Sequence, residues 1–324
     1  MKYTVLLALV VALFSCKQSY NPKTQKDALK EDVLSYVDPF IGTDGKGKTF
    51  PGATIPYGMV QLSPDNGRGG WDWISGYFYP DNIIAGFSHT HLSGTGAGDL
   101  YDISFMPLTE PYSRVTTEGG PSEGTIVSHF SHEQEQASPG FYQVFLEDYG
   151  IQVELTAGLR TGYQRYTYPK SATQGIVRID LGYSRNWDET VDTKLTVIDD
   201  YTVAGYRMSS GWATDQRVYF YTVFSHPISH YVLGQENATS SANSAKGEGV
   251  IFEGSFSLDK TRVITARTSL SSVSVENAKN NLLKEGLKKT FQTVKHEAEN
   301  HWRQELAKVD IDASQTTKIQ YYTA

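Results

Sequence analysis

The stretch with the most chemically versatile side chains lies between residues 37 and 107. It contains the segments WDWISGYFY and GFSHTHLSGTGAGDLYDISFMP, in which tryptophan, histidine and aspartate stand among glycines. Such a density of Gly and Pro beside polar and aromatic residues indicates long, shaped loops, and loops of this kind commonly carry binding groups. The candidate binding residues are therefore sought first in this block.

Two tryptophans open the first segment. Trp71 and Trp73 lie two positions apart, with Tyr77 and Tyr79 shortly after, so each pair faces one side if the chain is extended. An exposed indole ring makes a good platform for the C–H face of a sugar. The same rings can instead pack against neighbouring strands, and both interpretations stay open.

Two histidines follow in the second segment. His89 and His91 share one face of an extended chain, and Asp99 or Asp102 could complete a transition-metal site with them. Neighbouring Ser93 and the glycines favour a loop that is rich in hydrogen-bond groups instead. Three hypotheses result: hydrogen bonding to a sugar or a domain interface, structural polar packing, and a metal site.

Other motifs are weaker. The glycines at 94, 96 and 98 do not form a dinucleotide fingerprint, and no βαβ pattern surrounds them. Asp188 and Glu189 stand beside Trp187, but adjacent carboxylates point in different directions, and a solvated loop is the favoured interpretation. A serine-nucleophile motif of the G-x-S-x-G type is absent from the sequence.

Short alternating apolar runs at intervals of about ten residues extend from about residue 33 to 270. The clearest predicted strands are residues 141–146, 151–155, 176–180, 217–224, 250–258 and 261–269. Many short strands without intervening helices indicate a mainly β fold, an antiparallel β-sandwich over residues 32–270. The polar stretch 237–249 is predicted to be a surface loop.

The pattern changes to helical spacing after residue 270. Apolar positions three and four apart predict one or two amphipathic helices in a linker, residues 271–312. Residues 313–324 then resemble the opening of another helix, and we expect the chain to be interrupted there.

The first residues, MKYTVLLALVVALFSC, combine a positive charge, a short apolar run and a small-residue end. The apolar run is too short for a permanent membrane span. Residues 1–16 are therefore predicted to be an export signal, and Leu13 to Cys16 resembles a lipobox in which Cys16 is lipidated. Residues 17–31 read as a polar tether. We expect an exported lipoprotein anchored to a bacterial membrane, in the periplasm or at the cell surface.

The net charge of −7 carries no run of basic residues, which argues against nucleic acid as a partner. Twenty-one tyrosines, 14 phenylalanines and 5 tryptophans suit sheet faces and sugar contacts. Most of these aromatic residues are expected to lie in strand cores.

Several segments together resemble glycoside hydrolase family 92, from about residue 36 to the end. They are DPFIGT at 38–43, PGATIPYGM at 51–59, GFSHTHLSGTG at 86–96, SSGWA at 209–213 and YYTA at 321–324. The resemblance implies an N-terminal β-sandwich, a helical linker and a C-terminal helical toroid, with the active site between the two lobes. It also implies an inverting, calcium-dependent exo-mannosidase acting on α-linked mannose, with α-1,2 linkages of N-glycans or mannans expected.

The resemblance places the general acid and base in the toroid, so no residue of this sequence is matched to them, and the calcium ligands are not placed. The sandwich contribution to substrate binding is assigned to Trp71, Trp73, His89, His91 and Ser93. The expected partners are mannose-containing glycans and the protein's own C-terminal domain. The chain alone is expected to bind sugar weakly at most and to show no turnover.

Two rival hypotheses remain. A stand-alone surface lipoprotein that binds glycans would need an exposed aromatic platform. A zinc-dependent hydrolase would use His89 and His91 as metal ligands.

Overall fold

The computed structural model describes residues 32–111, 126–234 and 243–324. The chain divides into two units, Met1–Asp32 and Val33–Ala324, and the second contains the elements described below. The predicted export signal, Cys16 and the tether lie outside the described residues. No helix within the described ranges is long and apolar enough to cross a membrane.

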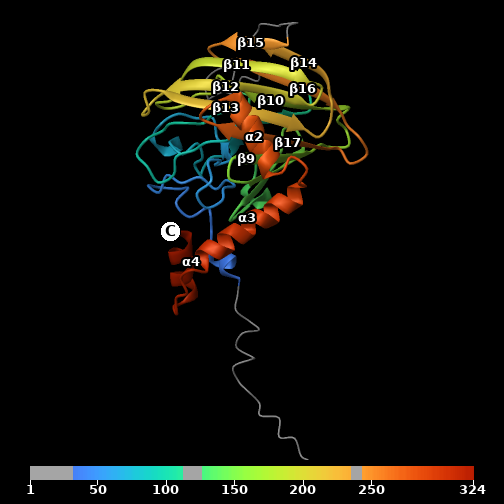
Figure 1. Cartoon of the computed structure of the whole chain (residues 1–324). Coiled ribbons are helices and arrows are strands. Elements are labelled where there is room, and N and C mark those ends of the chain that lie inside the picture. Colours follow the sequence, from blue (N-terminus) through green and yellow to red (C-terminus); the bar gives the residue numbers. More distant parts are fainter. Residues whose placement is uncertain (1–31, 112–125, 235–242) are drawn as a thin grey trace, which may run out of the picture. The chain divides into compact units, whose positions relative to one another are not determined.

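Two antiparallel sheets form most of the second unit, which confirms the predicted mainly β fold (Figure 1). The smaller sheet has the order β1, β3, β4, β10, β16, β14. Its strands are β1 (Ser63–Asp65), β3 (Gly86–Ser88), β4 (Ser104–Leu108), β10 (Gln174–Asp180), β16 (Ile251–Ser257) and β14 (Ile228–Gly234). A short pair, β2 (Ile83–Ile84) and β5 (Ser128–His129), lies apart from both sheets.

The larger sheet has nine strands in the order β15, β11, β12, β13, β17, β9, β8, β7, β6. These are β15 (Ser244–Gly247), β11 (Glu189–Asp199), β12 (Thr202–Ser210), β13 (Gln216–Phe224), β17 (Val263–Ser271), β9 (Thr161–Thr167), β8 (Ile151–Ala157), β7 (Phe141–Leu146) and β6 (Glu135–Ser138). The prediction of a loop over 237–249 was wrong at β15, because Ser244–Gly247 pairs with β11.

The core lies between the two sheets. Phe224 of the nine-stranded sheet contacts Phe256 and Phe252 of the six-stranded sheet, with ring centroids 4.8 and 6.4 Å apart. All three rings are buried. Aromatic side chains bury large apolar areas and gain further from offset ring contacts, so this cluster is one of the joints that hold the sheets together.

Three α-helices follow the last strand. They are α2 (Val275–Glu285), α3 (Phe291–Leu306) and α4 (Gln315–Thr323), so the predicted linker contains two helices and the predicted third helix is present. The Ser274 hydroxyl caps α2 by accepting from the Asn277 N–H, and Gly286 ends it in the left-handed conformation, which glycine adopts readily. Helix α2 packs on β17 and β13, and α3 contacts β8.

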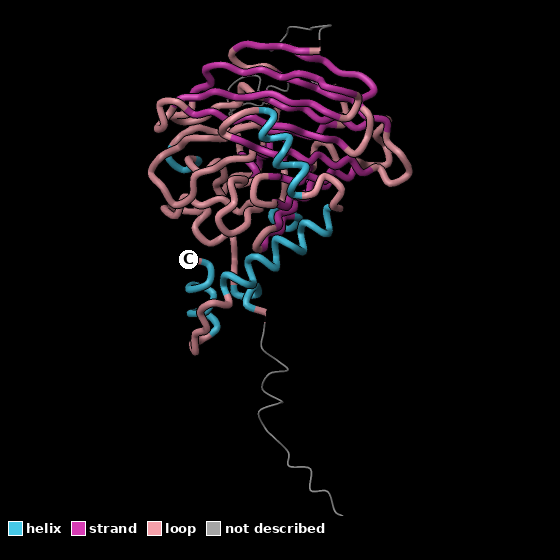
Figure 2. Tube along the Cα trace, viewed as in Figure 1, coloured by secondary structure: helices cyan, strands magenta, loops and turns pink. Residues whose placement is uncertain are grey.

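The remaining described residues form mostly loops (Figure 2). The loops include three short 3₁₀ turns, η2 (Val33–Tyr36), η3 (Trp71–Trp73) and η4 (His132–Gln134). Most of residues 37–103 are irregular, as their glycine and proline content predicted. The candidate binding residues therefore sit on loops that the two sheets carry.

Candidate functional site

Three loops meet around the segment Ser93 to Asp99, and each carries an exposed tryptophan. The side chains of Trp71, Trp187 and Trp212 are 61%, 54% and 66% exposed. Large aromatic residues left in water are informative because burial normally stabilises them. We call these three residues the tryptophan face.

Trp71 and Trp73 lie in η3, so the chain is not extended there and the condition under which the two rings would face one side is not met. A methyl group at Gly96 would lie 3.4 Å from Cη2 of Trp71, which places the ring against that segment. The Lys48 ammonium lies 6.0 Å from the Trp71 ring centroid and 2.8 Å from Asp72 Oδ1. Trp71 therefore combines an exposed ring with charged neighbours.

Trp73 has a structural environment instead. Its indole N–H donates to Asp81 Oδ2 at 2.9 Å, and its ring packs edge-on against Phe78 with centroids 5.3 Å apart. Both contacts lie within the loop, so Trp73 fixes the η3 turn that presents Trp71.

Asn186 joins the Trp187 loop to the Trp71 loop and to Tyr101. Its side-chain Oδ1 accepts from the Gly70 N–H at 2.7 Å, and its Nδ2 donates to the Tyr101 hydroxyl at 3.1 Å. The next residue, Trp187, donates its backbone N–H to the Gly98 carbonyl at 3.0 Å. Asn186 has φ +59°, a conformation that asparagine tolerates better than most residues.

Asp99 joins the Trp212 loop to the same segment. Its Oδ2 accepts from the backbone N–H groups of Trp212 and Ala213, at 2.9 and 3.3 Å, and its Oδ1 accepts from the Leu100 N–H. A methyl group at Gly211 would lie 2.4 Å from Asp99 Oδ1. Because Asp99 is buried and occupied by these donors, it acts as an anchor for the loop.

Arg207, on β12, lies beneath these loops with its side chain fully buried. Its Nη1 donates to Asp102 Oδ1 at 2.8 Å, and its Nη2 donates to Asp188 Oδ2 at 2.5 Å and to the Tyr183 carbonyl at 3.0 Å. The prediction that Asp188 lies in a solvated loop was therefore wrong, because the guanidinium draws this carboxylate into the interior.

The charges of this cluster affect one another. Burial raises the pKa of Asp188 to about 6; the Arg207 guanidinium opposes this shift, and nearby Asp102 adds to it. Burial also opposes the charge on Arg207, but Asp102 and Asp188 outweigh it and hold the Arg207 pKa above its usual range. The Arg207 guanidinium thus stays charged while it holds together the loop segments that contain Asp102 and Asp188.

His89 is completely buried. Its Nδ1–H donates to the Ile103 carbonyl at 2.8 Å, and burial lowers its pKa to about 4, so the ring is neutral near pH 7. Its Nε2 lies 3.5 Å from Gln164 Nε2, an amide donor on β9. The structure therefore supports the structural-packing hypothesis for His89 and gives it no exposed atom to offer a ligand.

His91 is buried as well. Its Nδ1 donates to the Gln61 carbonyl at 2.7 Å, and its Nε2 lies 3.0 Å from both Ser88 Oγ and Asp65 Oδ1. Within the described ranges, no group of three or more His, Cys, Asp or Glu residues could hold a metal ion. The described residues therefore do not fit the zinc hypothesis built on His89 and His91.

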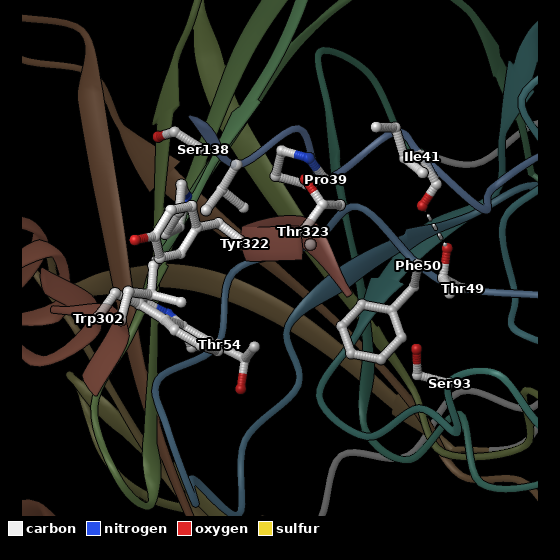
Figure 3. A pocket seen from close by; sticks show the side chains of 15 residues that line it. Pro39, Ile41, Thr49, Phe50, Thr54, Ser93, Ser138, Trp302, Tyr322 and Thr323 are labelled. Atoms are coloured by element: carbon white, nitrogen blue, oxygen red, sulfur yellow. Dashed lines mark hydrogen bonds between the residues drawn. The ribbon is translucent and has the colours of Figure 1, made fainter. Parts of the chain in front are cut away.

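A cavity of about 300 Å³ adjoins the same loop. Ser93 and Phe50 lie on one side of it, and Trp302 of α3 and Tyr322 of α4 lie on the other (Figure 3). The Trp302 indole N–H donates to the Thr54 carbonyl at 2.6 Å, which fixes α3 against the loop that contains Thr54. Of the five predicted binding residues, Ser93 lines the cavity, Trp71 lies on the tryptophan face, and Trp73, His89 and His91 support the loops.

Trp187 and Trp212 were not predicted to bind anything. Trp187 was noted only as the neighbour of two carboxylates, and Trp212 only as part of a family motif. A usable signal was present, because each tryptophan follows an Asn or Gly in a short polar segment, RNWDE or SSGWA. Tryptophan in such a segment has few apolar neighbours along the chain to bury it.

Comparison with known proteins shows consistent similarity. The model of the glycosyl hydrolase family 92 N-terminal domain matches residues 36–271. An uncharacterized secreted glycosidase from Arthroderma benhamiae is 25% identical over an alignment of 319 positions, which covers 89% of this chain and 40% of that protein.

Two solved structures extend the comparison. A family 92 α-mannosidase from Bacteroides thetaiotaomicron, solved with mannoimidazole, is 36% identical with a TM-score of 0.83, over 90% of this chain and 39% of that one. A family 92 inverting mannosidase from the same organism shares the fold, with 24% identity and a TM-score of 0.76 over 91% and 39% of the two chains. The chain thus spans about 40% of the length of these relatives.

Proposed function

Since the chain belongs to glycoside hydrolase family 92 through that family's N-terminal domain, we propose that it supplies substrate-binding loops to an exo-α-mannosidase. The observation that carries this proposal is the placement of exposed Trp71 against the loop whose Ser93 lines the cavity. An aromatic ring beside hydroxyl and charged groups suits a sugar, which has an apolar C–H face and a polar edge.

We propose that the described residues help to bind and orient the sugar substrate. Asp99 is occupied by three backbone donors, and Asp102 and Asp188 are held by Arg207, so these buried carboxylates near the tryptophan face are committed to structural contacts. Glycoside hydrolysis needs one protonated and one ionised carboxyl group across the scissile bond, about 6.5–9.5 Å apart in inverting enzymes. We assign no residue of this chain to that pair.

The finer features of the proposal follow from family membership. The proposed substrate is a terminal α-linked mannose of N-glycans or mannans, and the proposed preferred linkage is α-1,2. The proposed reaction inverts the anomeric centre. Calcium is proposed as the cofactor of the whole enzyme, where it would supply electrostatic contact to sugar hydroxyls. Since the described residues form no group of three or more His, Cys, Asp or Glu side chains, we propose that its carboxylate ligands come largely from other parts of the whole enzyme.

We also propose that the protein is exported and lipidated at Cys16. The proposal rests on the charged and apolar first residues and on the lipobox-like end of that run. The name of the Arthroderma relative, a secreted glycosidase, supports export. Mass spectrometry of the protein expressed in a bacterium with a lipoprotein pathway tests it, since an unmodified Cys16 would contradict the anchor.

A second candidate function is glycan binding without catalysis. Three exposed tryptophans on hydrogen-bonded loops would serve a surface lipoprotein equally well. Both proposals expect no turnover by this chain alone, so release of mannose from an α-mannobioside by the purified chain would contradict the pure binding role and also the placement of the acid and base outside this chain.

Saturation-transfer NMR with methyl α-mannoside and methyl α-galactoside tests the proposed site. We expect selective saturation transfer to the mannoside, and its loss in Trp71→Ala. A Tyr201→Ala variant is the matched control, since Tyr201 is an exposed aromatic residue at the turn between β11 and β12. Equal signals from both sugars, or no effect of Trp71→Ala, would count against the site.

A further inference from the structure

The tryptophan face has more exposed aromatic rings than a single sugar unit requires. Trp71 contacts the segment at Gly96, Trp187 is bonded to it at Gly98, and Trp212 is bonded to it at Asp99. These three anchor points span four consecutive residues, which is at most about 14 Å of extended chain. The three loops therefore meet at one segment of the protein, and each brings an exposed tryptophan to it.

The loops that carry the rings are fixed before any ligand arrives. Asn186 bonds to Gly70, Asp99 bonds to Trp212, and Arg207 holds Asp188 from below. Binding to such a surface loses little conformational entropy, because the protein groups are already ordered. This arrangement is expected of a recognition surface. It requires the buried charge cluster around Arg207.

The surroundings of the rings favour a sugar over an apolar partner. On the shared segment beside the rings lie exposed Ser93 and half-buried Thr95, and Lys48 and Asp72 border Trp71. A protein-binding hot spot usually has its aromatic anchors in a closely packed apolar centre. Separate rings with polar groups beside them match a chain of sugar units, in which C–H faces alternate with hydroxyl groups.

From these observations we propose that Trp187 and Trp212 bind sugar units beyond the one at Trp71, so that the tryptophan face holds an oligosaccharide. The inference rests on the proposed function, because Trp71 is taken as the position of the first sugar. It assigns to Trp187 and Trp212 the role of setting preference for substrate length.

The experiment measures dissociation constants of the purified chain by NMR titration with methyl α-mannoside, an α-mannobiose and an α-mannotriose. We expect the affinity to rise at each added unit. Trp187→Ala and Trp212→Ala should each lower the trisaccharide affinity about three- to tenfold, the range expected for one lost aromatic contact, with little effect on the monosaccharide. Tyr201→Ala is the control and should change neither.

Each other outcome overturns a defined part. If methyl α-mannoside binds and Trp71→Ala abolishes this, but affinity does not rise with length or ignores Trp187 and Trp212, the inference fails and the proposed function stands. If no mannoside binds, both fail. If the chain forms dimers in light scattering that Trp212→Ala dissociates, the face is a protein interface and the inference is wrong.

Discussion

The Nη1 atom of Arg207 lies 2.8 Å from Oδ1 of Asp102, a residue 105 positions earlier in the chain, and both side chains are completely buried. This contact joins β12 of the nine-stranded sheet to the loop that follows the two histidines. Asp102 also accepts from the Thr90 hydroxyl and from Gln216 Nε2, both at 2.8 Å. The ion pair and these hydrogen bonds thus fix the loop that carries Asp102 to the sheet.

Replacing Arg207 by Met should destabilise the fold by about 3–5 kcal/mol, because Asp102 and Asp188 would be left buried without their cation. Urea denaturation followed by circular dichroism measures the loss. Since the two carboxylates must then be protonated or remain uncompensated, the loss should grow between pH 5 and pH 8. Arg217→Met, which removes an exposed pair with Asp215, is the control and should have a much smaller effect. Equal losses in the two variants would contradict the role given to Arg207.

Gly98→Ala should disturb the tryptophan face. A methyl group there would lie 2.6 Å from Cβ of Asn186, so the Trp187 loop must shift, at a cost of roughly 1–3 kcal/mol. Gly69→Ala is a close control, since its methyl group would meet nothing nearer than the Asn186 Oδ1 at 3.9 Å. Thermal unfolding and the fluorescence maximum of the tryptophans report both changes. An unshifted Gly98→Ala spectrum would show that the loops are looser than the structure indicates.

The neutral state of His89 predicts a pH dependence. The pKa of His89 is about 4 in the folded chain and 6.5 when exposed. Its contribution to the free energy of unfolding is therefore fully present above pH 6.5 and is lost as the pH falls toward 4. The shift corresponds to at most about 3 kcal/mol. Asp188 acts in the opposite direction between pH 4 and 6, because its raised pKa favours the protonated folded state.

The two contributions can be separated by mutation. His89→Leu should make the fall in unfolding free energy between pH 6.5 and pH 4.5 shallower, although it also lowers stability at pH 7 by leaving the Ile103 carbonyl without its donor. The measurement is a series of urea melts across this range. An unchanged slope in the variant would mean that folding does not lower the pKa of His89.

Calcium should leave the melting temperature of this chain unchanged. A ligand that binds only the folded state at 100 times its dissociation constant stabilises it by about 2.7 kcal/mol, which a thermal melt readily detects. Melts in millimolar calcium and in EDTA should superimpose, because the described residues offer no group of three or more His, Cys, Asp or Glu side chains. A calcium-dependent rise would locate a site that this chain can form alone.

Much of the fold could be predicted because it depends on local patterns. The alternation in residues 141–146 matches β7, whose buried positions include Tyr142, Val144 and Leu146. The helical spacing after residue 270 likewise predicted α2 and α3. Both signals arise from which side chains face the core, and a single segment records this directly.

The candidate site was harder to predict, because it depends on contacts between distant segments. Asp188 is buried because Arg207 lies beneath it, and Trp212 is held in place by Asp99, more than a hundred positions away. The two histidines were attractive candidates by type, yet their surroundings make them supports for the loop. Residue type and local spacing do not record which of two polar groups will be buried.

The nine-stranded sheet ends in two short strands, β15 and β6, of four residues each. At one edge β15 carries Lys246, and at the other the carboxylate of Glu135 turns inward, where the hydroxyls of Tyr77 and Tyr142 donate to it. Short edge strands with charged residues offer a poor template for pairing with another chain. A sheet this wide can therefore exist at high protein concentration with little tendency to grow into aggregates by adding strands.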